Sequence, residues 1–112
     1  MKLNDQVALV TGAGSGIGEA IAIGFAKTGA KVVCADKNLT GAKKTANTIL
    51  KNNGNAIAIK ADVSNPVDCN SQVETTIENF GTIDILVNNA GVGFHRMFIE
   101  TTLEDWNRVI GI

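Results

Sequence analysis

The sequence predicts an α/β fold in which helices cover both faces of a doubly wound parallel sheet. Two observations carry this prediction. Four short apolar, β-branched runs alternate with segments of helical spacing, and such alternation requires crossover connections between parallel strands. The runs are also almost continuously apolar, as in Ile85-Leu86-Val87, which is typical of strands covered on both faces. With 112 residues, of which 45% are hydrophobic, we expect one domain spanning residues 1–112.

The predicted strands recur at fairly regular intervals. They are Val7 to Val10, Lys31 to Ala35, Ala56 to Ala61 and Ile83 to Val87. Between the first two strands, apolar residues from Ile17 to Thr28 recur three and four positions apart, which predicts a helix. Gly29 provides a suitable C-terminal stop for it.

Three further helices are expected. One follows from an apolar stripe that ends near Asn53-Gly54: Ala42, Ala46, Ile49 and Leu50. Another begins at Asn65-Pro66, where proline suits the first helical position, and has an apolar face before Gly81: Val73, Ile77 and Phe80. The last opens with the capping-box pattern Thr101-x-x-Glu104 and directs three apolar residues inward: Trp106, Val109 and Ile110.

Composition and charge exclude several classes of partner. Ten basic residues stand against 11 acidic ones, for a net charge of -1 without a basic cluster, so we expect no nucleic-acid partner. The longest apolar run, near Ala20 to Ala26, is interrupted by Gly24, which predicts neither a signal peptide nor a membrane span. Cys34 and Cys69 are 35 positions apart and lack a further Cys or His at ligand spacing, so we expect ordinary thiols, no metal and a cytoplasmic setting.

A glycine-rich turn from Thr11 to Gly18 joins the first strand to the first helix. It holds alternating glycines at 12, 14, 16 and 18, which let backbone N–H groups approach phosphate oxygens at a helix N-terminus. The turn follows a Gly-x-x-x-Gly-x-Gly order. A P-loop would require Lys and then Ser or Thr after Gly18, where Glu19 and Ala20 stand. The other alternative is a tight strand-to-helix turn without a ligand, but four alternating glycines favour a pyrophosphate site.

Asp36 closes the second strand, 18 residues beyond Gly18. At this spacing a carboxylate meets the adenosine ribose hydroxyls of a dinucleotide. Its alternative role is that of an ordinary strand-end or turn aspartate. A carboxylate repels a 2′-phosphate, so the pattern favours NAD over NADP, although Lys37 is a basic neighbour that partly neutralises an added phosphate.

Four segments, taken in order, resemble the short-chain dehydrogenase/reductase family over essentially the whole chain. They are Thr11-Gly12-Ala13-Gly14-Ser15-Gly16-Ile17-Gly18, Asp36, Asp62-Val63 and Asn88-Asn89-Ala90-Gly91. The combination of the glycine turn with Asn-Asn-Ala-Gly after the fourth strand is highly specific. The resemblance implies a Rossmann-type sheet with four βα units present here and the remainder missing.

The resemblance also implies roles for individual residues. The pyrophosphate-binding residues would be Gly12, Ser15, Gly16, Ile17 and Gly18. Asp62 and Val63 would lie against the adenine, and Asn89 with Ala90 and Gly91 would line the cofactor ribose. Two structural alternatives remain open: Asp62 as a turn or cap leading into Ser64-Asn65-Pro66, and Asn88 with Asn89 as a hydrogen-bonded strand end.

By the same resemblance, the parent protein is an NAD-dependent oxidoreductase that transfers hydride between a nicotinamide and an alcohol or carbonyl substrate. The family commonly forms dimers and tetramers, so a homo-oligomer is expected. Its chemistry uses a Tyr, a Lys and a Ser, but this chain contains no Tyr. We therefore assign no catalytic residue and expect these 112 residues alone to be inactive. The alternative is a non-catalytic nucleotide-binding or interaction module.

The predicted last helix reaches the C-terminal end on apolar residues, and the fourth strand would form an apolar sheet edge. These features lead us to expect a fragment of a longer protein. His95, in the loop after Gly91, is interpreted as a solvated surface residue, and nearby Met97 and Phe98 as packing residues that alternatively line a substrate pocket.

Overall fold

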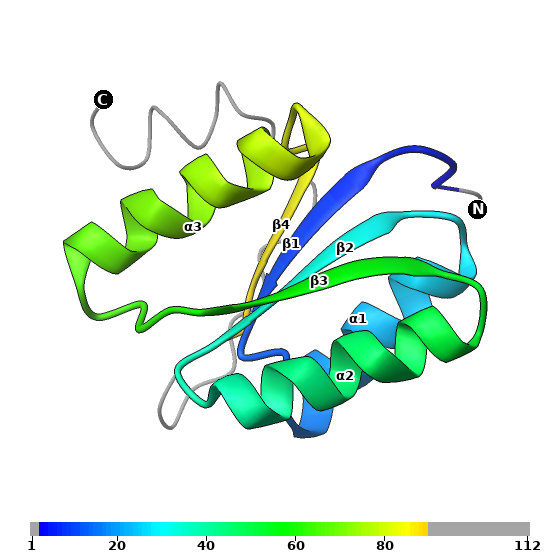
Figure 1. Ribbon diagram of the computed structural model, residues 1–112, viewed down its shortest axis with the longest axis horizontal. Helices are drawn as coiled ribbons and strands as arrows, with labels where there is room; N and C mark the ends of the chain where they lie inside the picture. Colours follow the sequence, from blue (N-terminus) through cyan, green and yellow to red (C-terminus); the bar gives the residue numbers. More distant parts are fainter. Residues whose placement is uncertain (1–2, 90–112) are drawn as a thin grey trace.

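The computed structural model describes residues 3–89 (Figure 1). Strands and helices alternate strictly in this part of the chain. The elements in order are β1 Val7–Thr11, α1 Gly16–Lys27, β2 Lys31–Asp36, α2 Leu39–Lys51, β3 Asn55–Lys60, α3 Pro66–Phe80 and β4 Ile85–Asn88. The predicted helix that opens at Thr101 lies outside the described residues.

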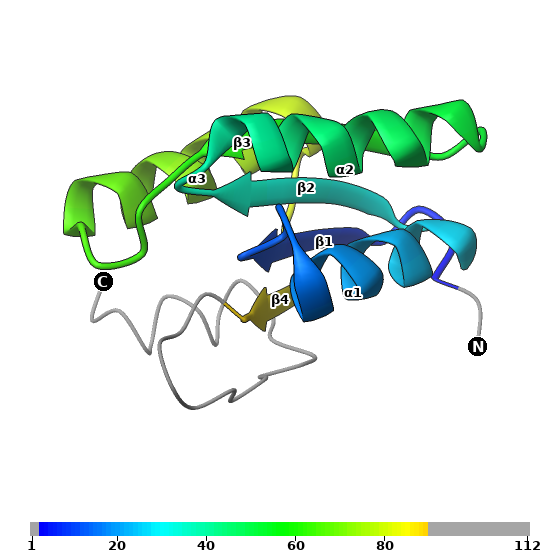
Figure 2. The same cartoon turned by 90° about the horizontal axis from the view of Figure 1, so that it is seen from below.

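The four strands form one sheet in the order β3-β2-β1-β4, and every neighbouring pair is parallel. The chain therefore moves outward from β1 through β2 to β3, and α3 then carries it back to the opposite side of β1. Helices α1 and α2 cover one face of the sheet and α3 covers the other (Figures 1 and 2). This arrangement confirms the predicted doubly wound α/β fold.

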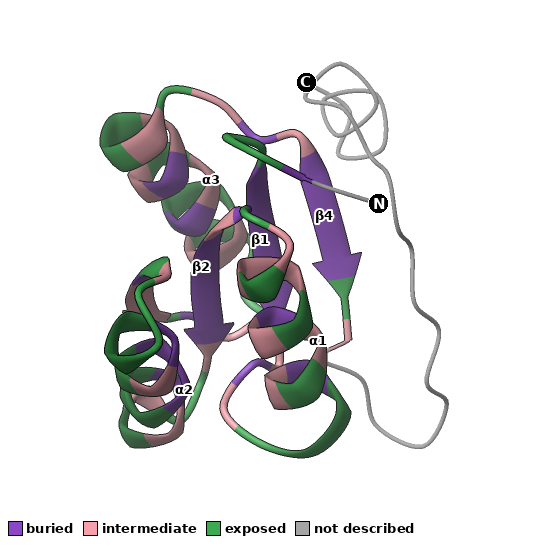
Figure 3. Ribbon diagram, turned by 90° about the vertical axis from the view of Figure 1, so that its right-hand side faces the viewer, coloured by how far each residue is buried: buried purple, intermediate pink, exposed green. Residues whose placement is uncertain are grey.

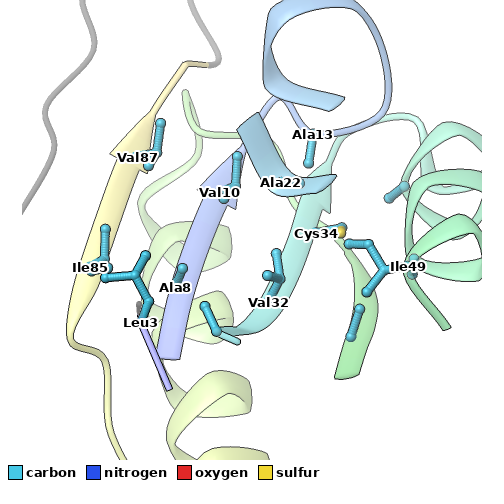
Figure 4. Packing of buried hydrophobic residues seen from close by; sticks show 14 residues of the cluster. Leu3, Ala8, Val10, Ala13, Ala22, Val32, Cys34, Ile49, Ile85 and Val87 are labelled. Carbon is cyan, nitrogen blue, oxygen red and sulfur yellow. The ribbon is translucent and has the colours of Figure 1, made fainter. Parts of the chain in front are cut away.

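Alternate side chains of the strands enter two separate apolar cores, one on each face. In agreement, β1, β2 and β4 are buried over nearly their whole length (Figure 3). The core under α1 and α2 is rich in alanine, and residues from every strand contribute to it: Ala8, Val10, Val32, Cys34, Ala56, Ile85 and Val87 (Figure 4). The core under α3 contains larger side chains, which include Leu9, Val33 and Leu86. Small residues on the first face let α1 and α2 pack close to the sheet.

The strand boundaries differ from the predicted ones by one or two residues: β1 and β2 each end one residue later, at Thr11 and Asp36, and the third and fourth strands are shifted at both ends. β3 begins at Asn55 and β4 begins at Ile85, two residues after the predicted start at Ile83. Ile83 is buried, at 2% exposure, but precedes the paired segment. Here the chain is tied to β1 by Asp84, whose backbone N–H donates to the Val7 carbonyl and whose carboxylate accepts the Val7 N–H at 2.8 Å. Apolar character at Ile83 thus indicates burial rather than strand pairing.

The helix starts and stops follow the predicted signals, with one wrong assignment. Pro66 begins α3, and Gly81 ends it in a left-handed conformation with φ 84°. The sequence predicts Leu50 on the apolar stripe of α2, but its side chain is 49% exposed. The fully buried Thr45 belongs to the stripe in its place. A helix that packs on a sheet buries a narrow face, and Leu50 lies just outside it.

Both cysteines are free thiols, Cys34 buried and Cys69 partly buried. In the segment 3–89, no helix has the length and hydropathy needed to cross a membrane.

Candidate functional site

The candidate site lies along one edge of the sheet, where all four strands end. Parallel pairing brings their carboxyl ends to the same edge, as the arrowheads of β2, β1 and β4 show (Figure 2). The strand order then fixes the sequence of groups along this edge. Asp62 follows β3, Asp36 ends β2, the glycine turn follows β1, and Asn89 follows β4. Ligands of open α/β sheets bind at this edge, next to the point where strand order reverses, which here is between β1 and β4.

Two kinds of local geometry favour glycine in the turn. Gly12 and Gly16 have φ values of 65° and 58°, which side chains rarely adopt. A Cβ on Gly18 would overlap the Gly12 carbonyl oxygen and lie 2.7 Å from the Asn89 amide nitrogen. A Cβ on Gly14 would lie 2.7 Å from the Asp36 carboxylate. Glycine is therefore favoured at positions 12 and 16 by backbone conformation and required at positions 14 and 18 by the close approach of neighbouring atoms.

The amino end of α1 has no side-chain cap among the described residues. Ser15 occupies the N-cap position in an extended conformation, but its hydroxyl makes no capping hydrogen bond. The other two helices are capped, α2 by Asn38 and α3 by Asn65. The first N–H groups of a helix have no intrahelical partner and carry about half a positive charge. Uncapped N–H groups behind a glycine turn form a suitable site for an anion.

Asp36 is fixed in place by two backbone donors. Its carboxylate accepts the Gly14 N–H at 2.8 Å and the Asn38 N–H at 2.9 Å. The first bond ties the end of β2 to the glycine turn, a role that spacing alone did not reveal. Each carboxylate oxygen can accept more than one hydrogen bond. Asp36 therefore keeps acceptor capacity for a ligand hydroxyl while it holds the turn.

Hydrogen bonds across β1 and β4 hold the Asn88-Asn89 segment. The Thr11 hydroxyl lies 3.3 Å from the Val87 carbonyl and 3.2 Å from the Asn88 side-chain oxygen, and it accepts the Asn89 N–H at 3.0 Å. The hydrogen-bonded strand end, one of the alternatives left open by the sequence, is therefore present. The side-chain oxygen of Asn89 is buried and has no hydrogen-bond partner within residues 3–89, so it is an acceptor available to a ligand.

Asp62 forms the turn that was the alternative to an adenine contact. Its carboxylate accepts the Ser64 N–H at 2.9 Å and the Ser64 hydroxyl at 2.7 Å. These two hydrogen bonds, with a smaller effect of the Lys37 charge, lower the pKa of Asp62 below its usual value. The backbone N–H of Asp62 donates to the Asp68 carboxylate, and the Val63 carbonyl accepts from the Cys69 thiol. The beginning of α3 thus holds the Asp62-Val63 segment.

Most of the predicted site residues meet at this one edge. Ala90 and Gly91 lie outside the described residues, as do His95, Met97 and Phe98. The main group missed by sequence reasoning is Gly14, whose N–H anchors Asp36. The sequence signal that could have identified Gly14 is its position, because the Gly-x-x-x-Gly-x-Gly order does not require a glycine there. Among residues 3–89 there is no group of three or more His, Cys, Asp or Glu side chains arranged to hold a metal ion.

Comparison with known proteins agrees with this arrangement. The chain is 43% identical over 111 residues to a 3-oxoacyl-[acyl-carrier-protein] reductase of Synechocystis, and the match covers 98% of this chain and 45% of the relative. A cyclohexanol dehydrogenase of Acinetobacter is 41% identical over 112 residues, with 99% of this chain and 45% of that protein covered. The chain thus spans a little under half the length of these curated relatives.

Solved structures show the same likeness. A hydroxysteroid dehydrogenase from Escherichia coli superposes with a TM-score of 0.81 at 37% identity, covering 96% of this chain and 45% of that one. A protein from Haemophilus influenza assigned as a D-mannonate oxidoreductase, solved with bound NAD, gives 0.77 at 30% identity and covers 82% of this chain and 32% of its own. The family model for short chain dehydrogenases matches residues 6–112. This chain therefore belongs to the short-chain dehydrogenase family.

Proposed function

We propose that residues 1–112 are the cofactor-binding part of an NAD-dependent oxidoreductase that acts on an alcohol or carbonyl substrate. The observation that carries the proposal is the uncapped amino end of α1, which follows the glycine turn beside the Asp36 carboxylate. It offers N–H donors for a pyrophosphate and an acceptor for a ribose at the same edge. When bound, the nicotinamide would accept or donate hydride.

The described residues fit such a cofactor. The segment Gly12 to Gly18, which includes Ser15 and Ile17, would hold the pyrophosphate, because it leads into the uncapped N–H groups at the start of α1. The Glu19 carboxylate, in the first turn of α1, repels an anion and therefore reduces the contribution of the helix end to pyrophosphate binding. The buried, unpartnered oxygen of Asn89 would accept from a cofactor hydroxyl, and Asp62 with Val63 would lie against the adenine. The family resemblance adds Ala90 and Gly91 to the ribose contacts.

The fixed position of Asp36 supports NAD over NADP. To move away from a 2′-phosphate, its carboxylate would have to give up its hydrogen bonds with the Gly14 and Asn38 N–H groups. Two unit charges about 5 Å apart repel by about 3 kcal/mol at an effective dielectric of about 20, which corresponds to roughly a hundredfold preference. Lys37 is exposed next to Asp36 and offsets part of this repulsion.

The cofactor preference is tested by titrating the full-length protein with NAD and with NADP. Asp36→Asn removes the charge but keeps one acceptor oxygen, so the NAD-to-NADP affinity ratio should fall by about tenfold or more. Glu78→Gln, which neutralises an exposed carboxylate on α3, is the matched control and should leave the ratio unchanged. An unchanged ratio in Asp36→Asn would refute the role given to Asp36.

Turnover is tested with the same protein and a panel of secondary alcohols and ketones, by following the absorbance of the reduced nicotinamide. The relatives named above are reductases and dehydrogenases, which favours an enzyme over a non-catalytic module. Tight NAD binding without turnover across the panel would overturn the oxidoreductase proposal and support the module.

A further inference from the structure

A buried hydroxyl on α2 contacts the glycine turn from behind. Thr45 is completely buried, and its hydroxyl lies 2.7 Å from the Ala13 carbonyl oxygen and 3.3 Å from the Gly41 carbonyl oxygen. A threonine in a helix commonly bonds the carbonyl four residues earlier. Here the contact with Ala13, 32 residues away, is the shorter one. Because a hydroxyl has a single proton, the geometry favours donation to the glycine turn.

A second residue of α2 approaches the same turn. A Cβ on Gly41 would lie 2.8 Å from the Gly14 carbonyl oxygen and 3.1 Å from its Cα. The φ of Gly41 is not in the positive range, so the close approach, rather than backbone conformation, requires glycine there. The first two turns of α2 thus pack directly on the backbone of residues 13 and 14.

The peptide at Ala13 is held from both sides. Its N–H donates to the Ala35 carbonyl at 3.1 Å, and its carbonyl accepts from Thr45. The next N–H, that of Gly14, donates to Asp36. Ala13 is fully buried and belongs to the same apolar core as Ala22 and Ile49 (Figure 4). These bonds tie the rear of the turn to β2 and α2, while the uncapped end of α1 follows directly after it.

We propose that α2 positions the cofactor-binding turn. Thr45 is the positioning residue, through its hydroxyl, and Gly41 allows the helix to pack directly on the backbone of the turn. The inference rests on the proposed function, since it assumes that the turn holds the pyrophosphate. Thr45 acts through the Ala13 carbonyl and does not itself contact the cofactor. Neither residue belongs to the glycine motif.

The test compares two matched pairs of variants in the full-length protein. Thr45→Val removes the hydroxyl at nearly constant shape, and Thr48→Val does the same to a hydroxyl that bonds only within α2, to the Lys44 carbonyl at 3.0 Å. Gly41→Ala introduces the close contact with Gly14, and Gly24→Ala adds a methyl on α1 where no atom of residues 3–89 lies within 4 Å. Thr45→Ser keeps the hydroxyl and reports on the methyl group.

The measurements are the dissociation constants of NAD and of adenosine, which lacks the pyrophosphate. We expect Thr45→Val and Gly41→Ala to bind NAD about tenfold more weakly, the factor that corresponds to one ordinary hydrogen bond. The loss of adenosine affinity should be smaller than the loss of NAD affinity, because the turn contacts the pyrophosphate directly and affects the ribose only through the hydrogen bond between the Gly14 N–H and Asp36. Thr45→Ser, Thr48→Val and Gly24→Ala should bind NAD as the wild type does. A general loss of stability would weaken the binding of NAD and of adenosine to the same degree.

Equal NAD affinity in Thr45→Val and Thr48→Val would overturn the inference and leave the proposed function intact. So would an equal loss in Thr45→Ser and Thr45→Val, because a variant that keeps the hydroxyl would then bind NAD as weakly as one that lacks it. If Thr45→Val does not fold, the comparison of Gly41→Ala with Gly24→Ala decides, and equal affinities there overturn the inference. A wild-type protein that binds neither NAD nor NADP refutes the proposed function, and the inference falls with it.

Discussion

Two glycines of α1 provide a matched test of how tightly the glycine turn is packed. Gly18 is buried in the first turn of the helix, and a Cβ there would overlap the Gly12 carbonyl oxygen and lie 2.7 Å from the Asn89 amide nitrogen. Gly24 lies later in the same helix and is exposed, and in the described part of the chain no atom would lie within 4 Å of an added Cβ. Gly18→Ala and Gly24→Ala therefore add the same methyl group to the same helix in opposite surroundings.

The expected free energies of unfolding follow from two effects. Alanine in place of glycine stabilises a helix by about 0.5–1 kcal/mol, which is the whole effect at position 24. At position 18 the methyl meets a backbone carbonyl that cannot rotate aside, so the cost of overpacking reaches its usual upper end of about 3 kcal/mol. Gly18→Ala should then be destabilised by about 2 kcal/mol net, roughly 3 kcal/mol below Gly24→Ala.

The assay is urea unfolding of the full-length protein at one protein concentration, because any oligomer would make the stability depend on concentration. With an m-value of about 2 kcal/mol/M, the two midpoints should lie about 1.5 M apart, with wild type between them. A Gly18→Ala midpoint equal to or above that of wild type would refute the close packing of Gly18 against Gly12.

Two predictions concern groups with shifted pKa values. Burial raises the pKa of the Cys34 thiol to about 12, so only about one molecule in ten thousand carries the thiolate at pH 8. Iodoacetamide should therefore label Cys34 only after unfolding, as detected by peptide mass spectrometry. Labelling of the native protein at the rate of a free thiol would contradict this. Hydrogen bonds from Ser64 lower the pKa of Asp62 below its ordinary value of 3.8, so its ionised form stabilises the fold above that value and the contribution is lost as pH falls through the folded pKa. Asp62→Asn should therefore lower the urea midpoint at about pH 7, and the difference from wild type should shrink as the pH falls below 3.8; a difference that does not change with pH would show that ionisation of Asp62 is not involved.

The local features of the fold follow directly from the sequence. Pro66 starts α3 and Gly81 ends it because one lacks a backbone N–H and the other adopts a positive φ without strain. The alternation of apolar strands with helical stripes predicted a parallel sheet, and parallel pairing brings every strand end to one edge. Asp36 and the glycine turn could thus be assigned to one site from the sequence, because each is defined by residues close together in the chain.

One burial assignment failed and two buried polar residues were not anticipated, all at positions where exposure depends on what lies opposite. Leu50 is apolar and near the stripe of α2, yet it is 49% exposed. On α3, the polar Gln72 and Thr76 are buried, at 2% and 0% exposure. Hydrophobic periodicity identifies which side of a helix faces the sheet, but the width of the helix face that becomes buried depends on how the neighbouring elements pack.

The sequence by itself determined the class of fold, the strand-to-helix glycine turn and the carboxylate that ends β2. Only the tertiary structure decided which groups meet. β4 lies beside β1, which brings Asn89 to Thr11, 78 residues earlier, and Gly14 meets Asp36 across 22 residues. The contact of Thr45 with Ala13 is of the same kind. Turn and helix signals depend on neighbours along the chain, whereas strand order and hydrogen bonds between distant backbone groups are set by the packing of the whole sheet and its helices.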